Sequence, residues 1–74
     1  MKRFGAKLHQ LRTQQGLTLA ELGGLLGVHN TFVSQLERGR KLPNAEMILK
    51  VADTFNVSTD QLMRDELDLP EYNC

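Results

Sequence analysis

The sequence predicts an all-α domain built from five short helices. Along most of the chain, apolar residues recur three or four positions apart, and no segment shows the strict alternation of a half-buried strand. Glycines and helix-capping residues divide this periodic pattern into short stretches. A chain of 74 residues is expected to hold one small domain. Such a domain buries only about 60% of its unfolded surface, so it depends on close packing.

The first two helices are bounded by recognisable signals. The first is predicted over residues 4–14, with apolar residues on one face and Gly16 as its C-terminal glycine. The second follows Thr18, because Glu21 stands three positions later and completes a capping box. Gly27 is expected to end the second helix with a positive φ.

The third helix is predicted over roughly residues 30–38. Val33 and Leu36 are spaced to face inward, and Gly39 ends the helix. Its other side is polar, so the third helix is expected to expose that side to solvent or to a partner.

The last two helices begin at good N-caps. Asn44 is expected to cap the fourth helix, and Ser58 with Gln61 forms a second capping box for the fifth. The fourth helix carries the strongest amphipathic pattern, which predicts core positions at Ala45, Ile48, Leu49, Ala52 and Phe55.

Charge is distributed unevenly although the net charge is zero. Residues 1–50 carry eight basic and three acidic side chains, whereas residues 51–74 carry one basic and six acidic side chains. This asymmetry favours a phosphate-facing surface, although an uneven but merely solvated surface would give the same count. The expected organisation is a folded domain over residues 1–64 and a flexible acidic tail over residues 65–74.

Several classes of function find no support in the sequence. The lone Cys74 excludes an intramolecular disulfide, and His9 and His29 lack partners at metal-ligand spacing, so neither a metal nor a cofactor is expected. There is no nucleophile–base pair or glycine-rich phosphate loop, which argues against an enzyme. No apolar run approaches a membrane span of about 18 residues. A cytoplasmic protein without a small-molecule ligand is the expectation.

The segment 18–39, TLAELGGLLGVHNTFVSQLERG, predicts a helix-turn-helix. Gly23 leaves room where the two helices cross, and Gly27 supplies the turn between them. The wedge between the helices is expected to be filled by Leu22, Leu26, Val28, Val33 and Leu36. A generic helical hairpin is the alternative, but both glycines and five apolar residues in register favour the helix-turn-helix.

Residues 8–63 resemble the Cro/CI-type helix-turn-helix family, also called the xenobiotic response element family. The resemblance rests on four runs in family order and spacing: LRTQQGLTLAEL, LLGVHNTFVSQLERG, LPNAEMILKVADTFNVS and DQLM. It implies a compact, lambda-repressor-like fold of five helices that binds double-stranded DNA through the third helix, as a homodimer on a two-fold-related operator. It also implies a buried ion pair between Arg12 and Glu37.

Two positions depart from the family pattern. Leu19 stands where members commonly carry a phosphate-binding glutamine, and His29 stands where they cap the third helix with serine or threonine. If Asn30 provides the cap instead, its side chain is less free to contact a base. The run HNTFVSQLERG also resembles the controller proteins of restriction–modification systems.

The predicted DNA contacts fall into two groups. Base contacts are expected from the polar side of the third helix, at Asn30, Thr31, Ser34 and Gln35. Phe32 has two open interpretations, core packing or contact with thymine. Phosphate contacts are expected from Thr18, Arg38, Arg40 and Lys41, and more weakly from Lys7 and the neighbouring Lys2 and Arg3.

The predicted dimer interface lies on the fifth helix and the end of the fourth. It comprises Val51, Phe55, Val57, Leu62 and Met63, some of which belong to the core. The predicted function is a sequence-specific transcriptional regulator, either a repressor or a controller. The alternative is a protein-interaction module such as an antitoxin-like subunit or an anti-repressor.

Overall fold

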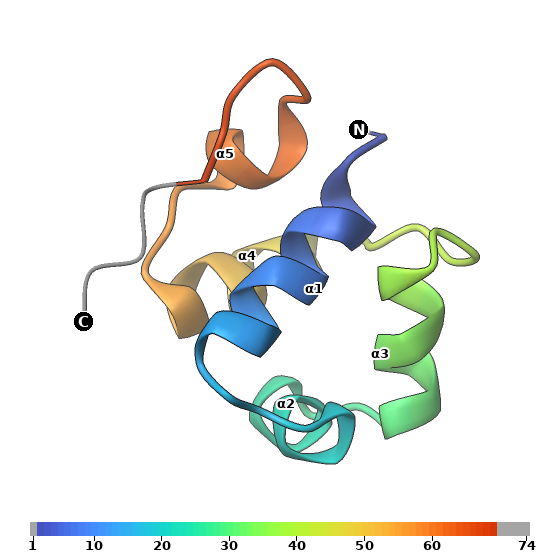
Figure 1. The fold of residues 1–74 in the computed structure, drawn as a ribbon. Coiled ribbons are helices and arrows are strands. Elements are labelled where there is room, and N and C mark those ends of the chain that lie inside the picture. The colour runs from blue at the N-terminus through green and yellow to red at the C-terminus, as the bar shows by residue number, and fades with distance from the viewer. Residues whose placement is uncertain (1, 70–74) are drawn as a thin grey trace.

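The computed structural model describes residues 2–69, which form five α-helices and no strand (Figure 1). They are α1 (Phe4–Gln14), α2 (Leu19–Leu26), α3 (Asn30–Glu37), α4 (Ala45–Phe55) and α5 (Thr59–Met63). The predicted all-α class is therefore confirmed. Within residues 2–69, none of these helices is long and apolar enough to cross a membrane.

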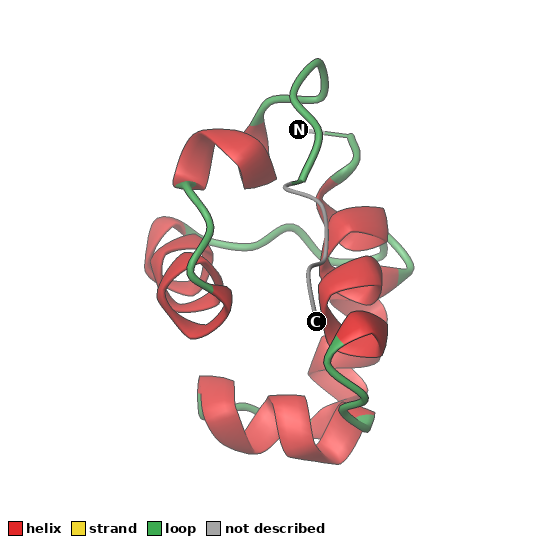
Figure 2. Ribbon diagram, turned by 60° about the vertical axis from the view of Figure 1, so that its left-hand side comes forward, coloured by secondary structure: helices red, strands yellow, loops and turns green. Residues whose placement is uncertain are grey.

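The helices enclose one small hydrophobic core. α3 packs against α1 and α2, while α4 contacts α2 and α5, and α5 also touches α1 (Figures 1 and 2). All five helices contribute buried side chains, which are Phe4, Leu8, Leu11, Leu22, Leu26, Val33, Leu36, Met47, Ile48, Val51, Ala52 and Leu62. The outer side of α3 takes no part in this packing.

The helix ends follow the capping signals in the sequence. Thr18 Oγ1 accepts a hydrogen bond from the Glu21 N–H at 3.0 Å, and the Glu21 carboxylate accepts one from the Thr18 N–H at 2.9 Å. Ser58 and Gln61 form the same reciprocal pair at 3.0 Å in both directions. Both predicted capping boxes are thus confirmed.

Two glycines allow α3 to lie close to its neighbours. A Cβ atom on Gly23 would lie 2.6 Å from the Val28 carbonyl oxygen, so only glycine fits at the crossing of α2 and α3. A Cβ on Gly5 would lie 2.5 Å from the Leu36 carbonyl oxygen. Because glycine has no Cβ, α1 can pack equally closely against the end of α3. Gly27 has φ of +75°, as the predicted turn requires.

The inward face of α4 differs from the predicted one. Met47, Ile48, Val51 and Ala52 are buried, whereas Ala45 is exposed and Leu49 is 56% exposed. The core predictions for Ala45 and Leu49 are therefore wrong. The apolar stripe of α4 is wider than the surface that α2 and α5 cover, so one edge of it faces solvent.

Lys7 is buried, and the prediction that it contacts phosphate is wrong. Its side chain is only 1% exposed, and Nζ donates hydrogen bonds to the carbonyl oxygens of Gln61 at 2.5 Å, Arg64 at 2.8 Å and Leu67 at 2.6 Å. A lysine ammonium has three donors, and all three are used here. Lys7 therefore fastens the segment after α5 to α1.

Asp65 makes the reciprocal contact at the start of α1. Its Oδ1 accepts hydrogen bonds from the backbone N–H groups of Lys2 at 2.8 Å and Arg3 at 2.9 Å, and these bonds hold the pKa of Asp65 below its ordinary value. The Arg3 guanidinium also pairs with Asp68 at 3.2 Å. The first residues after position 64 thus lie against α1 (Figures 1 and 2), contrary to the predicted boundary. Residues 70–74 of the expected tail lie outside the described residues.

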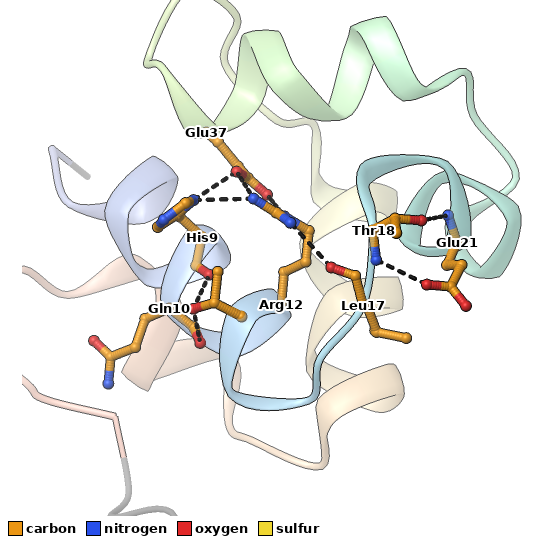
Figure 3. A network of polar contacts seen from close by, with 8 residues as sticks. His9, Gln10, Arg12, Leu17, Thr18, Glu21 and Glu37 are labelled. Atoms are coloured by element: carbon orange, nitrogen blue, oxygen red, sulfur yellow. Dashed lines mark hydrogen bonds and ion pairs between the residues drawn. The ribbon is translucent and has the colours of Figure 1, made fainter.

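An ion pair joins α1 to the end of α3, as the family resemblance implied. Arg12 Nε donates to Glu37 Oε2 at 2.7 Å, and Arg12 Nη2 donates to Glu37 Oε1 at 3.1 Å (Figure 3). The same guanidinium donates through Nη1 to the Leu17 carbonyl oxygen at 3.0 Å, just before α2. His9 Nδ1 lies 2.9 Å from Glu37 Oε1. One cation therefore connects α1, the start of α2 and the end of α3.

The environment of Glu37 favours its charged form. Burial by itself would raise the pKa of Glu37, but the hydrogen bonds and charges of Arg12 and His9 outweigh burial and lower it below the ordinary value. The hydrogen bond to Glu37 correspondingly raises the pKa of Arg12.

Acid is expected to weaken the domain through Glu37. Because the folded-state pKa is lowered, the stabilisation is fully present above the ordinary glutamate pKa and is lost as pH falls through the folded value. Urea unfolding between about pH 7 and about pH 3 measures this, with Glu37→Gln as the comparison. The stability advantage of the wild type over Glu37→Gln should shrink in acid. A constant advantage across this range would contradict the ion pair's role.

Two adjacent glycines should respond oppositely to alanine. Gly24 has open space around its missing Cβ and lies inside α2, so Gly24→Ala should stabilise the protein by about 0.5–1 kcal/mol. Gly23→Ala should destabilise it by about 1–3 kcal/mol, because the new methyl group meets the Val28 carbonyl. Chemical denaturation of both variants measures the difference. Equal effects would rule out the close crossing of α2 and α3.

Candidate nucleic-acid interface

The outward side of α3 presents most of the predicted base contacts on one surface. Val33 and Leu36 are buried, which fixes the rotation of the helix about its axis. Turned away from the core are Asn30, Thr31, Ser34 and Gln35, of which the first two are exposed and the others half-buried. Within residues 2–69 the side chains of Ser34 and Gln35 make no hydrogen bond. Their polar groups are therefore available to a ligand.

His29, and not Asn30, provides the N-cap of α3. Its Nδ1 accepts a hydrogen bond from the Thr31 N–H at 3.1 Å, in place of the usual serine or threonine oxygen. Asn30 is therefore not the cap, and its amide group is free to face outward. The Thr31 hydroxyl lies 3.1 Å from the same Nδ1 and 3.4 Å from Asn30 Oδ1, so it takes part in the cap.

Phe32 is half-buried and packs against the hydrophobic core. This contact supports the core interpretation. Contact with a thymine methyl group would involve only the part of the ring that remains exposed, and it stays a prediction.

Three cations lie at the C-terminal end of α3 and in the loop that follows. Arg38, Arg40 and Lys41 are exposed, and within residues 2–69 none of their side chains forms a hydrogen bond or an ion pair. Arg3 and Lys7, by contrast, are engaged with the segment after α5. Lys2 is exposed, and its side chain makes no hydrogen bond or ion pair within residues 2–69. The loop after α3 therefore holds three free cations at which an anion could bind.

Thr18 is committed to the start of α2. Its N–H donates to Glu21, and its Oγ1 accepts from the Glu21 N–H, so only its hydroxyl proton is left for a phosphate. Leu19 is half-buried and packs against the core, so the residue that replaces glutamine has become a packing residue.

The predicted dimer residues divide between the core and the surface. Val51 and Leu62 have 0% exposure, so their assignment to an interface is wrong. Phe55 and Val57 are half-buried, and Met63 is 43% exposed. The sequence could not separate the buried residues from the exposed ones, because all five are apolar.

An apolar hollow lies between α4 and α5. It has a volume of about 270 Å³ and is lined by Ala45, Ile48, Leu49, Thr59 and Met63. Leu49 is the residue that sequence reasoning missed here, because its spacing matches a core position. Within residues 2–69 no three histidine, cysteine or acidic side chains are grouped as metal ligands.

Sequence reasoning also missed two polar partners. His9 joins the Arg12–Glu37 pair, and its position three residues before Arg12, on the same helix face, was the available signal. Asp65 carried no such signal, since its partners are backbone N–H groups at the opposite end of the chain.

Comparison with known proteins places this geometry in a family. A family model described as helix-turn-helix matches residues 8–62. The chain is 32% identical over 63 residues to the uncharacterised transcriptional regulator YazB of Bacillus subtilis, covering 85% of this chain and 91% of that protein. It is 38% identical to the transcriptional activator BcrR of Enterococcus faecalis, but it spans only 31% of that protein's length.

Solved structures show the same similarity. The P22 c2 repressor in complex with a synthetic operator matches 85% of this chain and 96% of its own, with a TM-score of 0.79 and 30% identity. The restriction–modification controller protein C.AhdI of Aeromonas hydrophila matches 84% of this chain and 94% of its own, with a TM-score of 0.75 and 32% identity. The chain belongs to the Cro/CI-type helix-turn-helix family.

Proposed function

We propose that this chain is a DNA-binding transcriptional regulator that inserts α3 into the major groove. The observation that carries the proposal is that α3 combines an outward polar side with a C-terminal loop of three cations that have no partner within residues 2–69. A major groove accommodates an α-helix, and phosphates flank it on both sides.

The polar side of α3 fits base recognition. Asn30 and Gln35 carry amides that can pair with adenine in a bidentate manner, and Thr31 can offer its methyl group to thymine. Asn30 keeps this capacity because His29 provides the helix cap. Ser34 lies between them in the sequence and can donate to a base or a phosphate.

The loop after α3 fits phosphate binding. Arg38, Arg40 and Lys41 are exposed and unpaired within residues 2–69, so neutralising phosphates would cost no existing ion pair. Thr18 adds one hydroxyl donor at the start of α2. These contacts would give affinity that does not depend on sequence.

A homodimer is the expected active form, because a single α3 contacts few base pairs. Two copies related by a two-fold axis would place their recognition helices about 34 Å apart, one turn of DNA. The exposed apolar side chains of α4 and of the segment after it fit such an interface: Leu49, Met63 and Leu67, with Phe55 and Val57 half-buried. Leu49 and Met63 line the same apolar hollow, and exposed apolar surface of this kind is typical of an association surface.

The relatives support a repressor or controller role. The P22 c2 repressor was solved on its operator, and C.AhdI is a restriction–modification controller protein. The similarity extends over 96% of the solved P22 c2 chain and 94% of the solved C.AhdI chain. A chain of this kind would act in the cytoplasm, where DNA is accessible to it.

Two substitutions on either side of Gly39 should separate base recognition from phosphate binding. Gln35→Ala should cost about 1–3 kcal/mol on the operator selected from a random DNA pool and little on random DNA. Arg40→Ala should weaken binding to both DNAs similarly and reduce the salt slope by about 1. Fluorescence titration across a salt series measures both.

The opposite pattern would contradict these roles. Equal losses on operator and random DNA would remove Gln35 from the base contacts, and an unchanged salt slope would remove Arg40 from the phosphate contacts. If the wild type selects no DNA at all, the alternative of a protein-interaction module gains the support that DNA binding loses.

Dimer formation should depend on Leu49. Leu49→Asp places a charge in the apolar hollow between α4 and α5, and it should shift the protein to monomer at micromolar concentration. Leu42→Asp is the control, since Leu42 is also an exposed leucine but lies in the loop after α3, outside the hollow between α4 and α5. Sedimentation velocity distinguishes the two variants. A monomeric wild type, or a dimer that tolerates Leu49→Asp, would refute this interface.

A further inference from the structure

The segment before α1 is held in place by residues that follow α5. The Asp65 carboxylate accepts hydrogen bonds from the Lys2 N–H at 2.8 Å and from the Arg3 N–H at 2.9 Å. The Arg3 guanidinium donates in turn to the Asp65 carbonyl oxygen at 2.6 Å. The first residues of a domain are usually poorly ordered unless other contacts fix them. Asp65 supplies such contacts, so the backbone at position 2 has a fixed place on the domain.

The side chains of the two basic residues in this segment are used differently. The Arg3 guanidinium forms an ion pair with Asp68 at 3.2 Å. The Lys2 side chain is exposed and makes no hydrogen bond or ion pair within residues 2–69. Asp65 therefore binds the backbone of Lys2, and the ammonium group of Lys2 is left for a ligand.

The start of α1 lies against the end of α3. A Cβ on Gly5 would lie 2.5 Å from the Leu36 carbonyl oxygen and 2.6 Å from the Glu37 carbonyl oxygen, so the two backbones touch here. Lys2 stands three positions before Gly5, and the loop with the three free cations begins directly after Glu37. Figure 1 shows the start of α1 and this loop at the same end of the two helices. Lys2 thus adds a fourth free cation to that end of the domain.

We propose that Lys2 binds a DNA phosphate and that Asp65 is the residue that positions it. The proposal rests on the DNA-binding function argued above. Double-stranded DNA carries one negative charge per about 1.7 Å of its axis, so a backbone that meets the loop after α3 offers further phosphates to this end of the domain. A cation on a fixed backbone loses less conformational freedom on binding than one on a frayed chain end.

The proposal gives Asp65 an effect opposite to that of its charge. Removal of any acidic side chain makes the protein more positive, which by itself strengthens the attraction of DNA. Removal of Asp65 also releases the backbone of residues 2 and 3 and so weakens the phosphate contact of Lys2. The second effect should be the larger one, because the Lys2 contact is direct whereas the charge of Asp65 is screened by salt.

Glu66 provides the matched control. It is an exposed acidic residue in the same segment, its carboxylate pairs with Arg64 at 3.6 Å, and within residues 2–69 it has no contact with the segment before α1. Glu66→Ala therefore removes the same charge as Asp65→Ala but leaves residues 2 and 3 in place.

The experiment measures the binding of selected operator and of random DNA across a salt series. Lys2→Ala should weaken binding to both DNAs about 3- to 10-fold near 0.1 M salt and reduce the salt slope by about 1 per subunit. Asp65→Ala should also weaken both, by about 2- to 5-fold, because the contact is loosened and not removed. Glu66→Ala should bind as tightly as the wild type or slightly more tightly.

The double variant separates positioning from a purely structural role. Lys2→Ala should cost much less affinity, and change the salt slope less, when Asp65→Ala is already present. If Asp65 only stabilised the fold, Lys2→Ala would have the same effect in both backgrounds. Circular dichroism gives the folded fraction by which each affinity is corrected. If Asp65→Ala does not fold, Asp65→Asn replaces it, since it keeps one acceptor oxygen and should show a smaller loss of the same sign.

Failure of the inference is separate from failure of the proposed function. If the wild type binds DNA but Asp65→Ala, or Asp65→Asn in its place, binds as tightly as Glu66→Ala, Asp65 does not position a phosphate contact. An unchanged salt slope in Lys2→Ala would remove Lys2 from the phosphate contacts. If the wild type binds neither DNA, the proposed function itself fails.

Discussion

The position of α3 depends on the guanidinium of Arg12. It bonds Glu37 at the end of α3 and the Leu17 carbonyl before α2, and thereby fixes both parts of the helix-turn-helix to α1. The Glu37 side chain is only 7% exposed, so water cannot replace Arg12 as its partner at low cost. Hydrophobic packing sets how closely the helices approach, whereas this directional contact fixes where the end of α3 lies. The outward side of α3, which we propose to face DNA, is therefore positioned by contacts on the opposite side of the helix.

Signals that are local in the sequence predicted local structure well. The capping boxes at Thr18 and Ser58, and the turn at Gly27, depend on residues within four positions of each other. Such patterns need no knowledge of the rest of the fold. The same holds for the polar side of α3, which followed once Val33 and Leu36 were placed inside. Here the candidate site could be predicted because it is one continuous helix.

The errors arose where the answer depended on distant residues. On α4, the sequence pattern could not distinguish buried Val51 from exposed Leu49, because both are aliphatic and the width of the covered stripe is set by α2 and α5. Lys7 looked like a solvated cation, yet three carbonyls more than 50 positions away surround its ammonium group. Backbone carbonyls carry no signature in the sequence, so this contact could not have been found without the fold.

Folding turns the charge gradient of the chain into a localised cationic surface. The acidic segment after α5 neutralises part of the basic N-terminal end, where Arg3 pairs with Asp68 and the backbone before α1 binds Asp65. Within residues 2–69, the loop after α3 keeps three unpaired cations, while Lys2 is the unpaired cation before α1. An overall net charge of zero is thus compatible with a focused positive potential, since attraction of a polyanion depends on where free charges lie rather than on their sum. The segment 65–68 therefore neutralises part of the positive charge at the N-terminal end and leaves the cations of the loop after α3 unpaired within residues 2–69.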